Sequence, residues 1–238
     1  MFDLVAHSEY VVPLREEIAL VTESDGGSLQ KTSLSKLRKL DSFMRESQRM
    51  NPPALCEYYT RCRARVWLTF MAVSITRRML KGYVLSDGTI LEKGTNIALA
   101  SGGVHMDSTI YQDPKTFDGY RAYKLRDKPG NGNKFQHTMT GPDSFTFGKL
   151  ASSEDVPMRS LAEFTNTHFT GHGTHACPGR FFANAEMKLV LAYMLTHYDM
   201  KLKDGETRPM SEYQDVTVSA NRNGKILIRA RHDVGELS

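Results

Sequence analysis

The 238-residue sequence predicts an α+β fold that is mainly α-helical and carries small β-sheets. Residues 34–44 and the segment after Pro178 repeat apolar side chains at intervals of three and four, which is typical of amphipathic helices. Residues 84–100 alternate apolar and polar side chains around turns at 87–88 and 93–94, a pattern that predicts short strands. Hydrophobic residues make up 40% and charged residues 24% of the chain, which excludes collagen, coiled coils and wholesale disorder.

Charge, cysteine content and hydropathy narrow the class of protein. Lys and Arg exceed Asp and Glu by 31 to 27, without basic runs, so we expect no nucleic-acid partner. Three cysteines are too few, and odd in number, for a disulfide scaffold, which favours a reducing compartment. The longest apolar run, Val66–Ile75, is about half of the roughly 20 residues that a membrane crossing needs. We therefore expect no transmembrane segment in this chain and no signal peptide among its first residues.

The N-terminal part is predicted to hold two helices. The first runs from Phe2 to about Glu23 with an interruption near Pro13, and the loop Ser24–Gly27 follows it. The second begins at Ser33. It ends at Asn51-Pro52-Pro53, because proline lacks an N–H and disfavours helix for its predecessor.

The C-terminal part is predicted to be less regular until a late helix. Residues 102–170 are turn-rich, with a clear loop over 127–133. A long helix with a broad apolar surface follows Pro178. Residues 215–231 are predicted to form a closing hairpin, with its turn at 221–224.

The segment Phe169–Ala183, FTGHGTHACPGRFFA, carries the most chemical information. Cys177 follows a glycine-rich turn and precedes Pro178, a residue suited to the first turn of a helix. Free N–H groups at a helix start favour a thiolate, and the glycines allow the backbone to approach a flat ligand. His175 is within reach of an anionic group at the edge of such a ligand. This arrangement suits a haem iron.

Two other interpretations of Cys177 stay open at this point. A lone cysteine at a helix start is more often a buried structural residue than a ligand. Zinc is a further alternative, because His168, His172 and His175 lie close to Cys177 in the sequence. Their spacing, however, lacks the two separated ligand pairs of common zinc sites.

Two further motifs lie upstream. The segment LDSFMRESQRMNP contains Glu46 and Arg49, which stand three residues apart on one helical face and can therefore pair. The segment DPKTFDGYR holds Phe117 and Arg121, whose planar guanidinium could also bind Glu46. With the cysteine segment, these motifs resemble the cytochrome P-450 haem-thiolate monooxygenases, specifically the fungal membrane-anchored type. The resemblance covers most of the chain and corresponds to the C-terminal half of that fold.

The resemblance implies a cofactor and a set of site residues. The cofactor would be haem b, whose iron is ligated axially by the Cys177 thiolate. Cofactor-binding residues would be Cys177, His175, Arg77, Gly173 and Gly179, with Arg77 and His175 near the haem propionates. Glu46, Arg49 and Arg121 would have a structural role behind the haem, and no catalytic side chain is assigned. Gly119 stands where the family usually has proline.

The resemblance also implies an activity. The chain would be a monooxygenase that oxidises a lipophilic secondary metabolite, a terpenoid or meroterpenoid, in a fungal pathway. NADPH would supply electrons through an NADPH-cytochrome reductase. The family's oxygen-activating helix motif is absent from these residues, so the alternative is a truncated, catalytically inactive remnant. A third alternative is a binding or scaffold module without haem.

Domain organisation and location are expectations of the same kind. Residues 1–238 would form a single partial haem-binding domain. Residues 56–74 look foreign to the family and are predicted to be an insertion; Cys56, Cys62 and Trp67 lie in it. The family implies the endoplasmic-reticulum membrane, whereas a chain without an anchor would be cytoplasmic.

Overall fold

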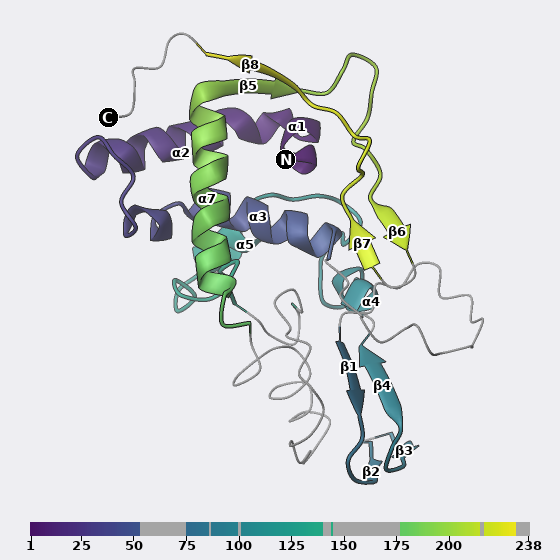
Figure 1. The fold of residues 1–238 in the computed structure, drawn as a ribbon. Helices are drawn as coiled ribbons and strands as arrows, with labels where there is room; N and C mark the ends of the chain where they lie inside the picture. The colour runs from purple at the N-terminus through teal and green to yellow at the C-terminus, as the bar shows by residue number, and fades with distance from the viewer. Residues whose placement is uncertain are drawn as a thin grey trace.

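The computed structural model describes residues 1–52, 75–85, 87–99, 101–139, 144, 177–214 and 217–231 (Figure 1). These residues form a mixed fold of helices and small antiparallel sheets, as the sequence predicts. The helical segments are α1 (Phe2–Ala6), the 3-10 turn η1 (Ser8–Tyr10), α2 (Val11–Ser24), the 3-10 turn η2 (Ser33–Ser35), α3 (Arg38–Met50), α4 (Ser101–His105), α5 (Arg121–Arg126) and α7 (Arg180–His197).

The described strands pair into four two-stranded antiparallel sheets. The strands are β1 (Ile75–Arg78), β2 (Tyr83–Val84), β3 (Ile90–Leu91), β4 (Asn96–Leu99), β5 (Tyr198–Lys201), β6 (Glu212–Gln214), β7 (Thr217–Ser219) and β8 (Leu227–Ala230). The pairs are β1 with β4, β2 with β3, β5 with β8 and β6 with β7. Figure 1 shows that β1 and β4, with β2 and β3 at their far end, extend away from the helices.

The N-terminal helix is interrupted earlier than the sequence suggests. The break lies at His7, whose backbone is non-helical, and not at Pro13. Pro13 lies in the first turn of α2, where a missing N–H removes no intrahelical hydrogen bond. The second helix also begins later, because Leu37 separates η2 from α3, and it ends at Met50, next to Asn51, as predicted.

The strands predicted within 84–100 are present, with Gly88 and Gly94 both at positive φ in their turns. The long helix after Pro178 is present as α7. The prediction of a turn-rich region over 102–170 was incomplete, because the short helices α4 and α5 lie in its described part.

The closing hairpin was the wrong prediction. Its turn exists, since Gly224 N–H donates to the Asn221 carbonyl at 3.3 Å. The strands on either side, however, pair elsewhere: β7 with β6, and β8 with β5 across the end of α7. Each strand finds a partner that precedes it in the chain, which the local pattern of residues 215–231 does not encode.

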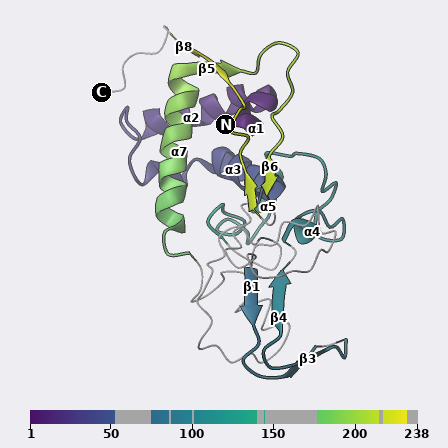
Figure 2. The ribbon, with the colours of Figure 1, turned by 45° about the vertical axis from the view of Figure 1, so that its right-hand side comes forward.

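The core lies where α7 crosses α2 and α3 (Figures 1 and 2). Its side chains are mainly leucines that are almost fully removed from solvent. They are Leu4, Leu14, Ile18, Leu34, Leu37, Leu40, Phe43, Met44, Ala192 and Leu195. Full burial of one such side chain contributes roughly 1.5–3 kcal/mol. This packing holds the C-terminal half of α7 against α2 and α3.

Side chains of α2 cap the two helices that it crosses. The Glu17 carboxylate accepts hydrogen bonds from the backbone N–H groups of Lys39 and Leu40, at 2.7 and 3.0 Å, in the first turn of α3. Arg15 donates to the Leu195 carbonyl at 2.7 Å, near the C-terminal end of α7. These contacts satisfy backbone groups that a helix leaves open at its ends. Among the helices that the structure describes, none has the length and apolar character to cross a membrane.

Candidate functional site

Cys177 precedes α7 by three residues. The N-terminal end of α7 points away from β5 (Figure 1). Its thiol is free and partly exposed. The guanidinium and the backbone N–H of Arg180 both donate to the Cys177 carbonyl, at 2.9 and 3.3 Å. Gly179 caps the helix, and a Cβ built there would lie 3.9 Å from the cysteine Sγ, an ordinary contact. The local chain therefore presents the thiol at the start of an 18-residue helix.

The other predicted cofactor-binding residues are placed only in part. Arg77 lies in β1, where its backbone pairs opposite Ile97 of β4. Gly173 and His175 lie outside the described residues, as do His168 and His172 of the zinc alternative. Within the described ranges, no three His, Cys, Asp or Glu side chains gather into a metal-binding cluster.

Glu46, Arg49 and Arg121 meet in one buried ion-pair cluster. Arg49 binds both carboxylate oxygens of Glu46 through two nitrogens, Nη2 at 2.7 Å and Nε at 2.9 Å. Arg121 Nε lies 3.2 Å from each of the same oxygens, and the Asp118 N–H donates to one of them at 3.0 Å. Glu46 is 3% exposed. Buried charges require such compensation, because an unpaired buried charge is strongly destabilising.

The remaining nitrogens of the two arginines bind backbone carbonyls. Arg49 Nη1 donates to the carbonyls of His105 and Pro114, at 2.6 and 2.8 Å. Arg121 Nη1 donates to the Gln112 carbonyl at 2.5 Å. The cluster therefore joins α3 to α4 and to the irregular segment before α5. Its role in this structure is to hold these three segments together.

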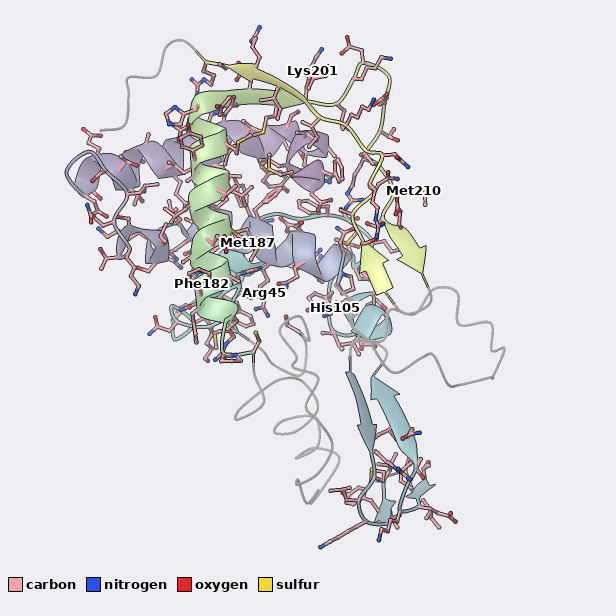
Figure 3. All side chains as sticks on the ribbon, viewed as in Figure 1. Arg45, His105, Phe182, Met187, Lys201 and Met210 are labelled. Atoms are coloured by element: carbon pink, nitrogen blue, oxygen red, sulfur yellow. The ribbon has the colours of Figure 1, made fainter. Side chains whose placement is uncertain are left out.

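Two features next to this cluster were not predicted from the sequence. His105 is fully buried at the end of α4, and burial together with the positive charge of Arg49 lowers its pKa to about 4 (Figure 3). Phe117 stacks on the His7 ring, with centroids 4.2 Å apart, and meets Phe43 edge-on at 5.2 Å. Neither feature can be read from the local sequence. His105 lies beside Arg49, and Phe117 contacts His7 and Phe43, and in each case the partners are far apart in the sequence.

Gly119 fits closely against this aromatic group. A Cβ at this position would lie 2.8 Å from Tyr10 and 2.9 Å from Phe43, closer than side-chain carbons pack. The Gly119 N–H also donates to the Tyr10 hydroxyl at 3.1 Å. A proline here would remove that donor. The departure from the family's usual proline therefore has a structural reason in this chain.

A second buried polar cluster was also missed. The Asp41 carboxylate lies 2.6 Å from Lys188 Nζ of α7 and 3.2 Å from Arg126 Nη1 of α5. It also accepts the His137 backbone N–H at 2.9 Å. The one local signal was Asp41 itself, a charged residue within the apolar repeat of α3.

Comparison with known proteins identifies the family. The cytochrome P450 family model matches residues 68–136 and 168–228, more than half of the chain. The chain belongs to the cytochrome P450 family. Its C-terminal match includes Cys177 and α7, and its N-terminal match includes β1–β4 and Arg121.

Several P450 monooxygenases of fungi are similar to this chain. Cytochrome P450 monooxygenase BOA4 of Botryotinia fuckeliana is 38% identical over 97% of this chain, which covers 38% of that protein. Cytochrome P450 monooxygenase AN1598 of Emericella nidulans is 37% identical over 97% of this chain, which covers 35% of it. The chain thus spans somewhat over a third of the length of these relatives.

A solved P450 structure shares the fold. Retinoic-acid-bound cyanobacterial CYP120A1 superposes with a TM-score of 0.61 at 19% identity, over 96% of this chain and 40% of that one. The P450 family implies a haem with a cysteine thiolate ligand and a redox partner. The described residues fit this group, because Cys177 offers a free, partly exposed thiol at the start of α7.

Proposed function

We propose that this chain is the haem-thiolate part of a fungal cytochrome P450 monooxygenase, with Cys177 as the axial iron ligand. One observation carries the proposal: Cys177 is a free thiol at the start of α7, inside the segment that the family model matches. Thiolate-ligated haem, when bound, activates O2 for insertion of one oxygen atom into a C–H bond. The side chains of this chain hold and orient that group.

The other site residues take supporting roles in this proposal. Arg77 and His175 would bind the haem propionates, and Gly173 and Gly179 would allow the loop to approach the ring. Glu46, Arg49 and Arg121 would brace the chain behind the haem, a role supported by their buried ion pairs. NADPH would supply electrons through a cytochrome reductase.

The substrate class rests on family analogy. Similarity to fungal P450 monooxygenases supports a lipophilic secondary metabolite, and we propose a terpenoid or meroterpenoid. We also propose the endoplasmic-reticulum membrane as the location, as expected from the family. Fluorescence microscopy of the tagged chain tests this location, and a diffuse cytoplasmic signal would contradict it.

Domain organisation is part of the same proposal. Residues 1–238 would belong to one haem-binding domain, with 56–74 as an insertion whose last residues, 68–74, fall within the family-model match. The composition of 56–74 supports this, since the chain's single tryptophan and two of its three cysteines fall there. Sequencing the transcript tests the insertion: a spliced message without these codons would show that they are retained intron.

The haem proposal is tested by the absorption spectrum of the purified chain, expressed with haem precursor, reduced and exposed to carbon monoxide. We expect the Soret band typical of thiolate ligation, lost in Cys177→Ser and kept in a Cys56→Ser, Cys62→Ser control. Folded protein without a haem band would reject the proposal. A haem band without substrate-dependent NADPH oxidation in the presence of reductase would favour the alternative, an inactive remnant.

A further inference from the structure

The Asp41 cluster ties the cysteine end of α7 to the rest of the molecule. α7 contributes two members, Asn184 and Lys188, which follow Cys177 by seven and eleven residues. They are four residues apart and therefore lie on one face of the helix. Lys188 is 3% exposed and binds Asp41 at 2.6 Å, while Asn184 Oδ1 lies 2.8 Å from Nδ1 of His137.

These contacts lie in the half of α7 that has no fully buried apolar side chain. The buried face of α7 continues from Lys188 to Ala192 and Leu195, so the half far from the cysteine is held by core packing. Near the cysteine, by contrast, large apolar side chains point to solvent. They are Phe181, Phe182 and Met187, of which Phe182 and Met187 are labelled in Figure 3. Lys188 is the buried α7 residue nearest to Cys177.

The partners of the two α7 residues come from three separate parts of the chain. Asp41 belongs to α3, His137 follows α5, and the Leu34 carbonyl of η2 accepts from Lys188 Nζ at 2.9 Å. The Lys188 ammonium binds both the Asp41 carboxylate and the Leu34 carbonyl, and hydrogen bonds depend on direction more strongly than apolar contacts do. A shift of the helix would leave buried charges without partners, at a high free-energy cost.

We infer that Lys188 and Asn184 are positioning residues, whose contacts with Asp41 and His137 fix the Cys177 end of α7 relative to α3. That these contacts also hold the iron ligand in place rests on the proposed function of Cys177. That they fix the start of α7 does not, because it concerns only the position of the helix. Neither residue reaches the thiol; each acts through the helix that Cys177 precedes.

Two variants test this inference, with a matched control. Lys188→Met keeps the length of the side chain and leaves Asp41 paired with Arg126. Asn184→Ala removes one half-buried polar contact, to His137. Leu195→Ala is the control, because it removes buried volume from the opposite half of the same helix. All three are compared at a temperature where circular dichroism shows an intact fold.

Hydrogen exchange of the chain gives a readout that needs no haem. We expect Lys188→Met to accelerate amide exchange in residues 180–188 by about tenfold relative to residues 192–197, with a smaller effect of the same kind in Asn184→Ala. Leu195→Ala should show the opposite distribution. Equal acceleration along α7 in all three variants, or none in Lys188→Met, would overturn the inference.

The carbon monoxide spectrum adds a second readout. If the wild-type chain shows the thiolate band, Lys188→Met should convert a larger fraction of the haem to the form without that band than Leu195→Ala does. An unchanged fraction in Lys188→Met would contradict the inference. Absence of the band from the wild-type chain would instead reject the proposed function, and hydrogen exchange would then decide the positional claim.

Discussion

At the scale of single residues, Glu46 is a buried carboxylate that neutralises two arginines. Its two oxygens face Arg49 and Arg121 at 2.7–3.2 Å. We expect Glu46→Gln to lower the free energy of unfolding by about 3–5 kcal/mol, because it leaves both guanidinium groups without a counter-charge. Urea denaturation of the purified chain measures this change.

An exposed ion pair provides the control for that experiment. Lys201 lies 2.7 Å from Asp204, but the two side chains are 62% and 89% exposed. Exposed pairs contribute little, so Lys201→Met should alter the free energy of unfolding by less than about 0.5 kcal/mol. Equal losses in Glu46→Gln and Lys201→Met would show that the buried cluster has no special importance.

Gly119 leads to a second residue-scale prediction. Gly119→Ala would place a methyl group within 3 Å of Tyr10 and Phe43. We expect a loss of about 1–3 kcal/mol, measured by thermal unfolding, because packed aromatic rings must move to admit it. Gly132→Ala is the matched control, since nothing lies within 4 Å of its Cβ position. A Gly119→Ala protein as stable as wild type would mean that this packing is looser than the distances indicate.

At the scale of elements, α2 stabilises its neighbours by capping them. Burial raises the pKa of Glu17, although hydrogen bonds from the Lys39 and Leu40 amides oppose this shift. Glu17→Gln replaces one of the accepting oxygens with an NH2 group, which cannot accept an N–H. We expect a loss of about 1 kcal/mol, comparable to loss of an N-cap, in urea denaturation at pH 7. The exposed neighbour serves as control, and Glu16→Gln should leave stability unchanged.

At the scale of the whole molecule, two buried histidines make stability depend on pH. Burial is the main cause that lowers the pKa of both His105 and His137 to about 4. Between pH 6.5 and about 4 the unfolded chain therefore binds more protons than the folded chain, and stability falls as pH falls. Each histidine should lower the free energy of unfolding by on the order of 2 kcal/mol when the pH falls from 7 to 5.

Urea denaturation across this range measures the effect. The free energy of unfolding should decrease from pH 7 to pH 5, and His105→Gln should make this decrease smaller by removing one of the two groups. The comparison uses the slope against pH, so a uniform loss of stability in the variant does not affect it. An unchanged slope in a His105→Gln, His137→Gln double variant would assign the pH dependence to other groups.

The sequence by itself determined the features that are encoded locally. The apolar repeats of α3 and α7, the prolines after Asn51 and the glycine turns at Gly88 and Gly94 each lie within one short segment. A helix or a tight turn is a property of a few neighbouring residues, so its pattern survives without the rest of the chain. The family motifs were recognisable for the same reason, since each spans only a few positions.

Tertiary structure alone decided which distant segments meet. The pairing of β8 with β5, the burial of His105 and the cluster of Asp41 with Lys188 join residues tens to more than a hundred positions apart. Period and composition do not specify such partners, because many strands and charges are compatible with the same local pattern. Their choice depends on how the helices pack, and this packing brings Lys188, on the helix that Cys177 precedes, to Asp41 of α3.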